Sequence, residues 1–563
     1  MDQRNSQKFT GGESRRDFLK KSAAVVAGGQ ILSPSIYAQG GQSSVSIVTD
    51  PSDTALSQPP VRRALEQLQQ ALKAKGASSQ IHQAIDNTSA EDEVILVARR
   101  GSALSRPLLD HAGMSVSDAP ESVGLVRGQA GNRPALLVSG SDARGLVYGL
   151  LEVADSVTHA TAALAALRDT EDTTETPANP IRSVTRYFES DVEDKSWFYD
   201  KSFWRPYLSM LMAQRFNRFS LGFGLGYNRP EDVHDAYLYF SYPFLFSVPG
   251  YNVRVPELPD EERDRNWAML RWISEEVTAR GLDFQLGLWT HAYQWIDSPK
   301  ANYTIEGLTP EKHGPYCRDA LHKLLEECPA IKGITIRAHS ESGVPEGSYD
   351  FWQAVFDGVK RAGRRVEIDI HSKGIEHKLL RMALDTGSPV KVSPKYWAEH
   401  MGLPYHQASI REMERVPRDR PAHLVETQRR FTRYGYGDYL REDREYGVLY
   451  RIWPGTQRTL LWGDPAMAAG YGRYAHFCGS DGLELSEPLS FKGRMGSGLP
   501  GGRNAYADAS LRPSGGDWRK HAYTYRLWGR LLYNPEASPE TWRRHLKTEF
   551  GPAAGHCEGA LPD

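Results

Sequence analysis

Two patterns of hydrophobic and polar residues follow one another along this chain of 563 residues. In residues 43–168, short apolar runs such as SVSIVTD, EVILVAR and PALLVSG predict strands. Between them, PPVRRALEQLQQALKAKG and DARGLVYGLLEVADSV repeat apolar residues three and four positions apart, which predicts amphipathic helices. A length of about 120 residues is that of an independent domain. We therefore expect a compact α+β domain in this part of the chain.

A second pattern begins after residues 169–180, an acidic, threonine-rich segment that ends in proline and predicts a linker. From 181 to 510, short apolar runs alternate with helical stretches. The predicted strands are RSVTRYF, FNRFSLGFG, LDFQLGLW, IKGITIRAH, RRVEIDIH, SPVKVSPKYW, YGVLYRIWP and DGLELSEP. Eight βα units over about 330 residues predict an α/β fold, the (β/α)₈ TIM barrel. Residues 511–563 predict the start of a C-terminal helical region.

The carboxyl ends of these strands are where such barrels carry their chemistry. Here those ends are rich in charged, histidine and aromatic side chains, and the whole chain has 13 Trp and 27 Tyr. Aromatic rings are common platforms for sugars, so the inventory favours a carbohydrate site. The residues predicted to bind substrate are Arg186, Trp289, His291, Arg337, His339, His371, Lys395, Tyr396, Trp397, Arg451, Trp453 and Glu484.

The fourth predicted strand runs into IRAHSESGVPEG and presents Glu341 on a turn of small residues. Glycoside hydrolysis typically needs two carboxyl groups, one that donates a proton and one that activates water or attacks. Glu341 is predicted to be the proton donor. It follows an apolar strand, and partial desolvation there would raise its pKa. Ser340, Ser342 and Gly343 leave space for a sugar. The second carboxylate stays open among Glu399, Asp369, Glu484 and Glu487.

The histidines at the strand ends leave other chemistry open. A metal-dependent hydrolase would use them as ligands, although the first strand lacks the His-x-His pair of such barrels. The ligands would be His291, His339, His371, His400, Asp369 and Glu341. Neutral imidazoles also bind sugar hydroxyls, and we predict no metal and no cofactor. A polysaccharide lyase and a non-catalytic carbohydrate-binding protein are further alternatives.

The N-terminus carries an export signal. SRRDFLK precedes a weakly apolar stretch, which is typical of a twin-arginine signal over residues 1–38 with cleavage after Ala38. The apolar run is too short to span a bilayer, so we expect a periplasmic or secreted protein with no membrane span in its mature chain. A net charge of −2 argues against nucleic acid as a partner. The 4 cysteines are too widely spaced for a disulfide framework or a zinc site.

Three stretches resemble glycoside hydrolase family 67, the α-glucuronidases. HSESGVPEG resembles the turn after the family's fourth strand, in which the glutamate matching Glu341 is the general acid. SGSDARGLVYGLLEVAD resembles the family's N-terminal domain, which family 20 hexosaminidases share, at Gly145, Tyr148 and Gly149. YRLWGRLLYNPEASPETWRRHLKTEFG resembles a helix near the family's C-terminus.

The resemblance implies an inverting glycoside hydrolase that acts on a plant or algal-type polysaccharide or its oligosaccharides, with α-glucuronidase-like activity as the finer expectation. VKVSPKYWAEH stands where the family has Phe-Gln-Val-Arg-Glu-Pro and does not reproduce it, so Glu399 matches the family's base by position alone. The family continues into a longer helical domain, and we expect this C-terminal region to be truncated by comparison. The expected partners of the protein are a carbohydrate substrate and a second copy of the chain in a homodimer.

Overall fold

The computed structural model describes residues 43–224, 235–295, 298, 301–373, 375–394, 442–452, 463–476, 479–486 and 506–562. The chain divides into two compact units, Met1–Ser43 and Ser44–Asp563. The predicted export signal therefore lies outside the described residues. Within them, every helix is too short or too polar to cross a membrane.

A six-stranded sheet opens the second unit, with the strand order β2-β1-β3-β5-β4-β6. Its strands are β1 (Ser44–Thr49), β2 (Ser78–His82), β3 (Glu93–Arg99), β4 (Val123–Ala130), β5 (Arg133–Gly140) and β6 (Thr173–Glu175). The helices around it are α2 (Pro59–Ala74), α3 (Arg106–Ala112), α4 (Ala143–His159) and α5 (Ala163–Arg168). The sheet is mostly parallel, with β4 antiparallel to β5 and β6. The predicted linker 169–180 thus supplies an edge strand.

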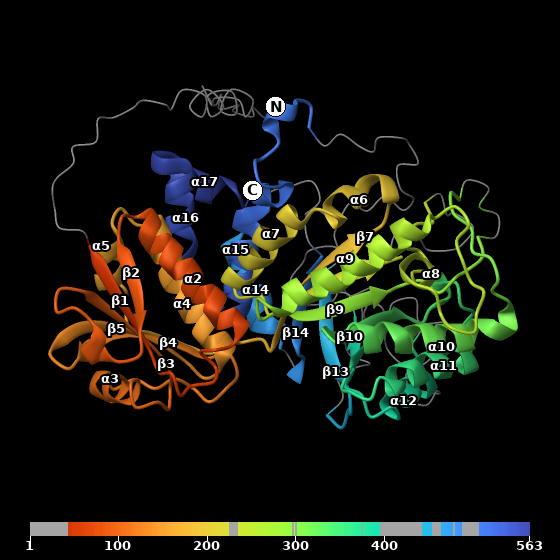
Figure 1. Cartoon of the computed structure of the whole chain (residues 1–563), viewed down its shortest axis with the longest axis horizontal. Coiled ribbons are helices and arrows are strands. Elements are labelled where there is room, and N and C mark those ends of the chain that lie inside the picture. Colours follow the sequence, from red (N-terminus) through yellow and green to blue (C-terminus); the bar gives the residue numbers. More distant parts are fainter. Residues whose placement is uncertain are drawn as a thin grey trace, which may run out of the picture. The chain divides into compact units, whose positions relative to one another are not determined.

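Helices cover both faces of this sheet. Successive strand residues point to opposite faces, so Ile47 joins the apolar cluster of α2 and α4, whereas Val48 joins that of α3. In Figure 1, α2 and α4 run side by side. The predicted α+β domain is confirmed.

The Gly-x-x-Tyr-Gly stretch of α4 has a packing explanation. A Cβ on Gly145 would clash with the carbonyl oxygen of Ser122, so only glycine lets the helix approach the sheet this closely. Tyr148 faces the barrel instead, where its hydroxyl accepts a hydrogen bond from Arg182 Nη2 at 2.9 Å. Arg182 also forms an ion pair with Glu121. The stretch therefore joins the sheet to the barrel.

Eight parallel strands close the predicted barrel in the order β10-β11-β12-β13-β14-β7-β8-β9. They are β7 (Ile181–Phe188), β8 (Arg218–Phe223), β9 (Asp283–Leu288), β10 (Ile331–Arg337), β11 (Glu367–His371), β12 (Val390–Ser393), β13 (Gly447–Ile452) and β14 (Gly482–Ser486). The helices between them are α6 (Asp191–Phe198), α7 (Lys201–Ala213), α8 (Tyr242–Leu245), α9 (Asp260–Thr278), α10 (Pro310–Glu327), α11 (Tyr349–Arg361), α12 (His377–Leu384) and α14 (Pro465–Tyr474). The (β/α)₈ fold is confirmed.

The C-terminal residues are helical, as predicted, and contact the first sheet domain. Their helices are α15 (Ala522–Tyr533), α16 (Glu540–Phe550) and α17 (Ala554–Ala560). From α15, Arg526 Nη2 lies 2.6 Å from Asp155 Oδ1 of α4. From α16, Arg544 Nη2 lies 2.5 Å from Glu152 Oε1 of the same helix. These ion pairs tie α15 and α16 to α4.

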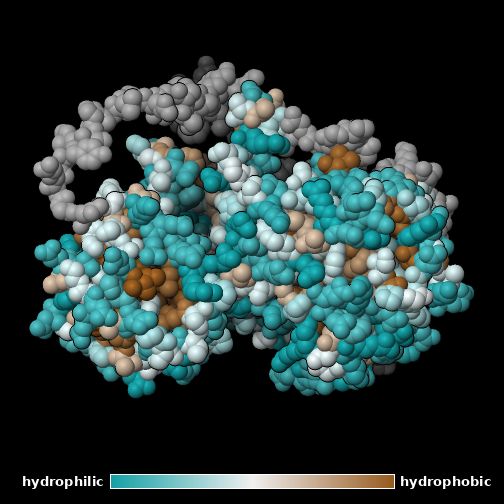
Figure 2. Space-filling view, viewed as in Figure 1, coloured by the Kyte–Doolittle hydropathy of each residue, from teal (hydrophilic) through white to brown (hydrophobic). Residues whose placement is uncertain are grey.

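Large hydrophobic side chains reach the surface singly. The face drawn in Figure 2 is largely hydrophilic, with small separate groups of hydrophobic residues. The exposed large hydrophobic residues of the described chain are Ile81, Val192, Tyr474, Leu511 and Phe550. They belong to five different elements, and single exposed residues of this kind are normal on a monomer. They lend no support to the expected homodimer.

Candidate active site

Glu341 lies on a single 3₁₀ turn, Ser340–Ser342, just beyond the carboxyl end of β10. The small residues of this turn pack against the loop after β9. The Ser342 carbonyl accepts hydrogen bonds from the backbone N–H groups of His291 and Ala292 at 2.8 and 3.1 Å. Gly343 has a φ of 81°, and a Cβ there would clash with Ala292. These two residues are therefore small because the neighbouring loop fills the space predicted for a sugar.

Two cations hold the Glu341 carboxylate. Lys373, just beyond β11, forms an ion pair with its Oε1, and Arg337 Nη1 of β10 lies 3.7 Å from its Oε2. Burial pushes the pKa of Glu341 upward, but Arg337 and Lys373 outweigh it and lower the pKa to about 2. The predicted rise of this pKa is wrong, because a lysine 32 residues away in sequence reaches the carboxylate.

A second carboxyl group, which the sequence analysis missed, lies next to this one. His339 Nδ1 accepts a hydrogen bond from the backbone N–H of Glu341 at 3.3 Å. The other ring nitrogen, Nε2, lies 3.1 Å from Oε1 of Glu346. Burial raises the pKa of Glu346, although Lys373 opposes the rise. The only signal in the sequence is Glu346 itself, placed after Pro345 in the same polar loop.

Asp369 and Glu484 lie inside the barrel. Both side chains have no exposed surface, and both form ion pairs with Arg451, whose guanidinium lies between them. Arg218, the first residue of β8, approaches them to 3.4 and 3.7 Å. The hydroxyl groups that donate to the two carboxylates belong to Thr335, Ser393 and Ser183. A buried ion network fills this layer, where aliphatic residues usually dominate.

This network changes the interpretation of Asp369. Burial raises its pKa, but Arg451 and Arg218 outweigh burial, so the pKa is lowered overall. With its carboxylate fully buried among arginines and hydroxyls, Asp369 does not reach the strand ends where a sugar would bind. The same burial keeps Glu484 and Arg451 from direct contact with substrate. These three predicted site residues are structural parts of the barrel core.

Trp289, His371 and Arg337 lie between this network and the turn that carries Glu341. The guanidinium groups of Arg337 and Arg451 stand 5.3 and 5.4 Å from the Trp289 ring centroid. His371 lies 5.6 Å from the same ring, and its Nδ1 is 3.1 Å from the Ser393 carbonyl oxygen. Trp289 is 1% exposed, so its ring stacks on arginines and is closed to a sugar. Trp289 therefore acts on the site only through Arg337, which it contacts and which approaches Glu341.

Arg186 and His291 lie away from this cluster. Ser183 of β7 contacts Glu484 of β14, and Tyr187 contacts Trp289, which follows β9. Arg186 alternates with these inward residues and faces outward, 4.0 Å from the ring centroid of Trp197 in α6. His291 is 1% exposed and packs against α11, where burial lowers its pKa to about 3. The prediction that these two bind substrate is not supported, because both are enclosed by helices.

The remaining predictions fall outside the described residues. They are Lys395, Tyr396, Trp397, Glu399, His400, Trp453 and Glu487. In the part that is described, no three His, Cys, Asp or Glu side chains are grouped so that they could hold a metal ion.

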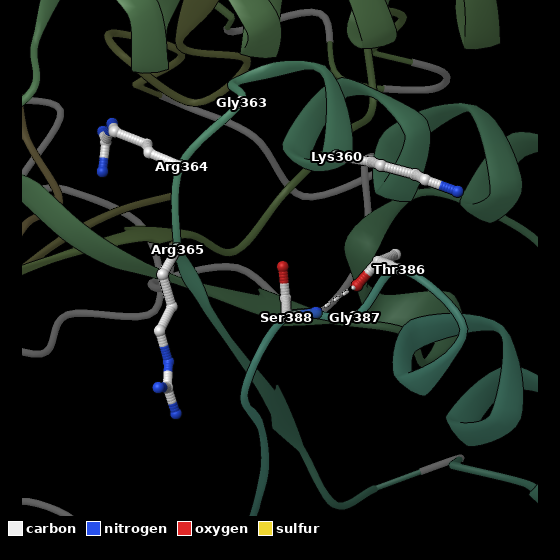
Figure 3. A pocket seen from close by; sticks show the side chains of 7 residues that line it. All are labelled: Lys360, Gly363, Arg364, Arg365, Thr386, Gly387 and Ser388. Atoms are coloured by element: carbon white, nitrogen blue, oxygen red, sulfur yellow. Dashed lines mark hydrogen bonds between the residues drawn. The ribbon is translucent and has the colours of Figure 1, made fainter.

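A cavity of about 520 Å³ lies at the other end of the barrel strands, where α11 and α12 lead into β11 and β12. Its lining residues are Lys360, Gly363, Arg364, Arg365, Thr386, Gly387 and Ser388. Figure 3 shows the Arg364 and Arg365 side chains pointing apart, with Thr386 next to Ser388. The Thr386 Oγ1 accepts a hydrogen bond from the Ser388 N–H at 3.1 Å. In the described part of the chain, no carboxyl group lines the cavity, and Glu341 is not among its lining residues.

A buried carboxyl pair joins the loops after β7, β8 and β9. The Asp191 N–H donates to Asp235 Oδ2 at 2.7 Å, and the Tyr303 hydroxyl donates to Asp191 Oδ2 at 3.3 Å. Asp235 is 3% exposed. Burial and the neighbouring Asp191 raise the pKa of Asp235 to about 8. Lys195 Nζ, 4.0 Å from Asp191, forms its closer ion pair with Glu262 at 2.7 Å.

We predict that Asp235→Asn raises the free energy of unfolding at pH 7 by an amount on the order of 2 kcal/mol. A pKa raised on folding gives stability that is complete below pH 3.8 and is lost as pH rises through about 8. An amide cannot ionise, so the variant avoids this loss. Its single oxygen replaces only one of the two acceptors that bind the Asp191 and Tyr237 N–H groups, so the gain is smaller than the pKa shift alone implies. Urea unfolding between pH 4 and 9 measures it. Asp191→Asn removes the like charge and should also weaken the dependence of the unfolding free energy on pH. If that dependence is unchanged in both variants, Asp191 and Asp235 do not interact as described.

Comparison with known proteins gives a fold. No protein family matches the sequence, and no curated protein matches it either. Among solved structures, a GH138 enzyme targeting pectin rhamnogalacturonan II superposes with a TM-score of 0.61 at 15% identity. The match covers 92% of this chain and 55% of that one, so the chain spans little more than half of that protein. The chain therefore shares its fold with the matching part of that enzyme.

A second solved structure, CpGH84D, aligns with a TM-score of 0.46 at 9% identity, over 92% of this chain and 70% of that one. The GH138 enzyme belongs to a family other than 67. The resemblance to α-glucuronidases therefore gains no support at the level of the family.

Proposed function

We propose that this protein is a glycoside hydrolase that acts on a plant or algal-type polysaccharide or its oligosaccharides. The observation that carries the proposal is the partly exposed Glu341 carboxylate at the carboxyl end of the fourth barrel strand, held ionised by Lys373 and Arg337. Carboxyl groups at this edge of a barrel are placed for catalysis. The fold shared with a GH138 enzyme agrees with this chemistry.

The electrostatics favour one role for Glu341. A proton donor must hold its proton at the working pH. With a pKa of about 2, roughly one Glu341 in 10⁴ is protonated at pH 6. We therefore assign Glu341 the role of the base that activates water, in place of the general acid predicted from the sequence.

The finer parts of the proposal rest on the sequence. An α-glucuronidase-like specificity is supported by HSESGVPEG, and export to the periplasm or beyond by SRRDFLK. Arg337, His339 and His371 are the described candidates that lie near Glu341. Further sugar contacts are proposed for Lys395, Tyr396, Trp397 and Trp453.

Incubation with aryl glycosides, aryl uronides and plant and algal polysaccharides tests the function. We expect new reducing ends, no near-ultraviolet absorbance from an unsaturated sugar, and full activity in chelator. Unsaturated products would identify a lyase, and loss in chelator a metal-dependent hydrolase. Sugar binding without any cleavage would identify a carbohydrate-binding protein.

A further inference from the structure

We propose that Glu346 is the proton donor to the leaving oxygen, so that the catalytic carboxyl pair is Glu341 and Glu346 with His339 between them. This inference rests on the proposed glycoside hydrolase function. It assigns the role of the acid to a residue outside the HSES turn and outside the carboxylates expected from the strand ends.

The His339 ring fixes the arrangement. Its Nδ1 accepts the backbone N–H of Glu341 at 3.3 Å, which requires an unprotonated Nδ1 and, in a neutral ring, a proton on Nε2. That Nε2–H faces Glu346 Oε1 at 3.1 Å. On the other side, Nδ1 lies 3.9 Å from Glu341 Oε2. One imidazole therefore separates two carboxyl groups and orients the second.

Exposure sets these groups apart from the buried carboxylates. The side chains of Glu341 and Glu346 are 20% and 26% exposed, so they are partly desolvated and still within reach of a ligand. Asp369 and Glu484, the other described candidates, have no exposed surface. Of these four carboxyl groups, only Glu341 and Glu346 have surface that a substrate could touch.

The pKa values of the two carboxyl groups shift in opposite directions, because cations dominate at Glu341 and burial dominates at Glu346. Lys373 forms its ion pair with Glu341, and Arg337 approaches the same carboxylate. Around Glu346, burial and the charge of Glu376 raise the pKa, against Lys373 and the Ser340 N–H. Acid–base catalysis needs two carboxyl groups whose pKa values are pushed apart, and the two pKa values here shift in opposite directions.

The proposed step is balanced. The O–H bond of Glu346 breaks and its proton passes to the glycosidic oxygen, while the bond between that oxygen and the anomeric carbon breaks. The oxygen of a water molecule bonds to the anomeric carbon as Glu341 removes its proton. The products are a free alcohol and a reducing sugar. Exchange with solvent then returns the proton to Glu346 and removes it from Glu341.

The test compares leaving groups. On the sugar that the wild-type protein cleaves, 2,4-dinitrophenyl and phenyl glycosides differ in their need for an acid, because dinitrophenolate leaves without protonation. For Glu346→Gln we expect kcat/KM on the phenyl glycoside to fall by about 10²–10⁴-fold, with less than about tenfold loss on the dinitrophenyl glycoside. The alkaline limb of the pH–rate profile should disappear. Glu346→Asp, which retracts the carboxyl group, should give an intermediate loss.

Two matched variants complete the design. Glu341→Gln should lose activity on both substrates alike, since the base is needed whatever the leaving group. Glu326→Gln on α10 changes a carboxylate that is 69% exposed and takes no part in the proposed step, and it should leave both rates unchanged. Equal losses on both substrates in Glu346→Gln, or none, would overturn the assignment and leave the hydrolase function standing. A wild-type protein that cleaves no glycoside would overturn both.

Discussion

Glu341→Gln should lower kcat by about 10³-fold or more on every substrate that the protein cleaves. Glutamine keeps the shape of the side chain but cannot take a proton from water. It also leaves Lys373 and Arg337 without their carboxylate. Steady-state kinetics with the substrate found in the screen measure the loss.

The same variant has a second signature in stability. A carboxyl pKa lowered from 4.5 to about 2 contributes stability that is present above pH 4.5 and lost as pH falls through about 2. Glu341→Gln should therefore lower the free energy of unfolding at pH 7 by an amount on the order of 2 kcal/mol.

The control for Glu341→Gln is Glu326→Gln on α10, whose side chain is 69% exposed. It should change neither the rate nor the stability measurably. Full activity in Glu341→Gln, with a folded protein, would remove Glu341 from the mechanism.

Asp369→Ala should cost about 3–5 kcal/mol of unfolding free energy, the range for breaking a buried ion pair. The substitution leaves Arg451 and Arg218 short of negative charge inside the barrel, and it takes the hydrogen-bond acceptor from Thr335. Urea unfolding should show a lower midpoint with an unchanged slope.

An exposed pair in the same chain is the matched control for Asp369→Ala. Arg254 Nη2 lies 2.8 Å from Glu306 Oε2, and both side chains are more than half exposed. Glu306→Ala should cost less than about 1 kcal/mol. Similar costs for the two substitutions would show that Asp369 does not balance the charge of the barrel core.

The fold was largely predictable because each barrel strand is a short apolar run between polar ends. IKGITIRAH and LDFQLGLW are buried on both sides as β10 and β9, as parallel barrel strands generally are. The sequence analysis missed three strands, β2, β4 and β6, all in the first sheet, and β4, VGLVRGQA, lies between β5 and β6. β2, SSQIH, and β6, TTE, are edge strands with polar sequences. Their strand conformation depends more on pairing with the neighbouring strand than on their own residues.

The site was harder to predict, because position at a strand end does not give the direction or the partners of a side chain. Arg186 is close to the end of β7 yet faces α6. The pKa of Glu341 depends on Lys373, which comes from the next strand. Glu346 follows Pro345 in a polar loop, and only the folded position of His339 links it to Glu341.

The ion network inside the barrel also constrains how this protein can evolve. Arg218 and Arg451 face Asp369 and Glu484, whose side chains have no exposed surface, and Arg218 also pairs with Glu367 at 2.9 Å. If any one of the four facing residues is lost, a buried charge is left without its partner. Replacing several of them at once by apolar residues need not lower stability. Across homologous sequences, these four positions should therefore change together, as a linked set that is inherited whole or replaced whole.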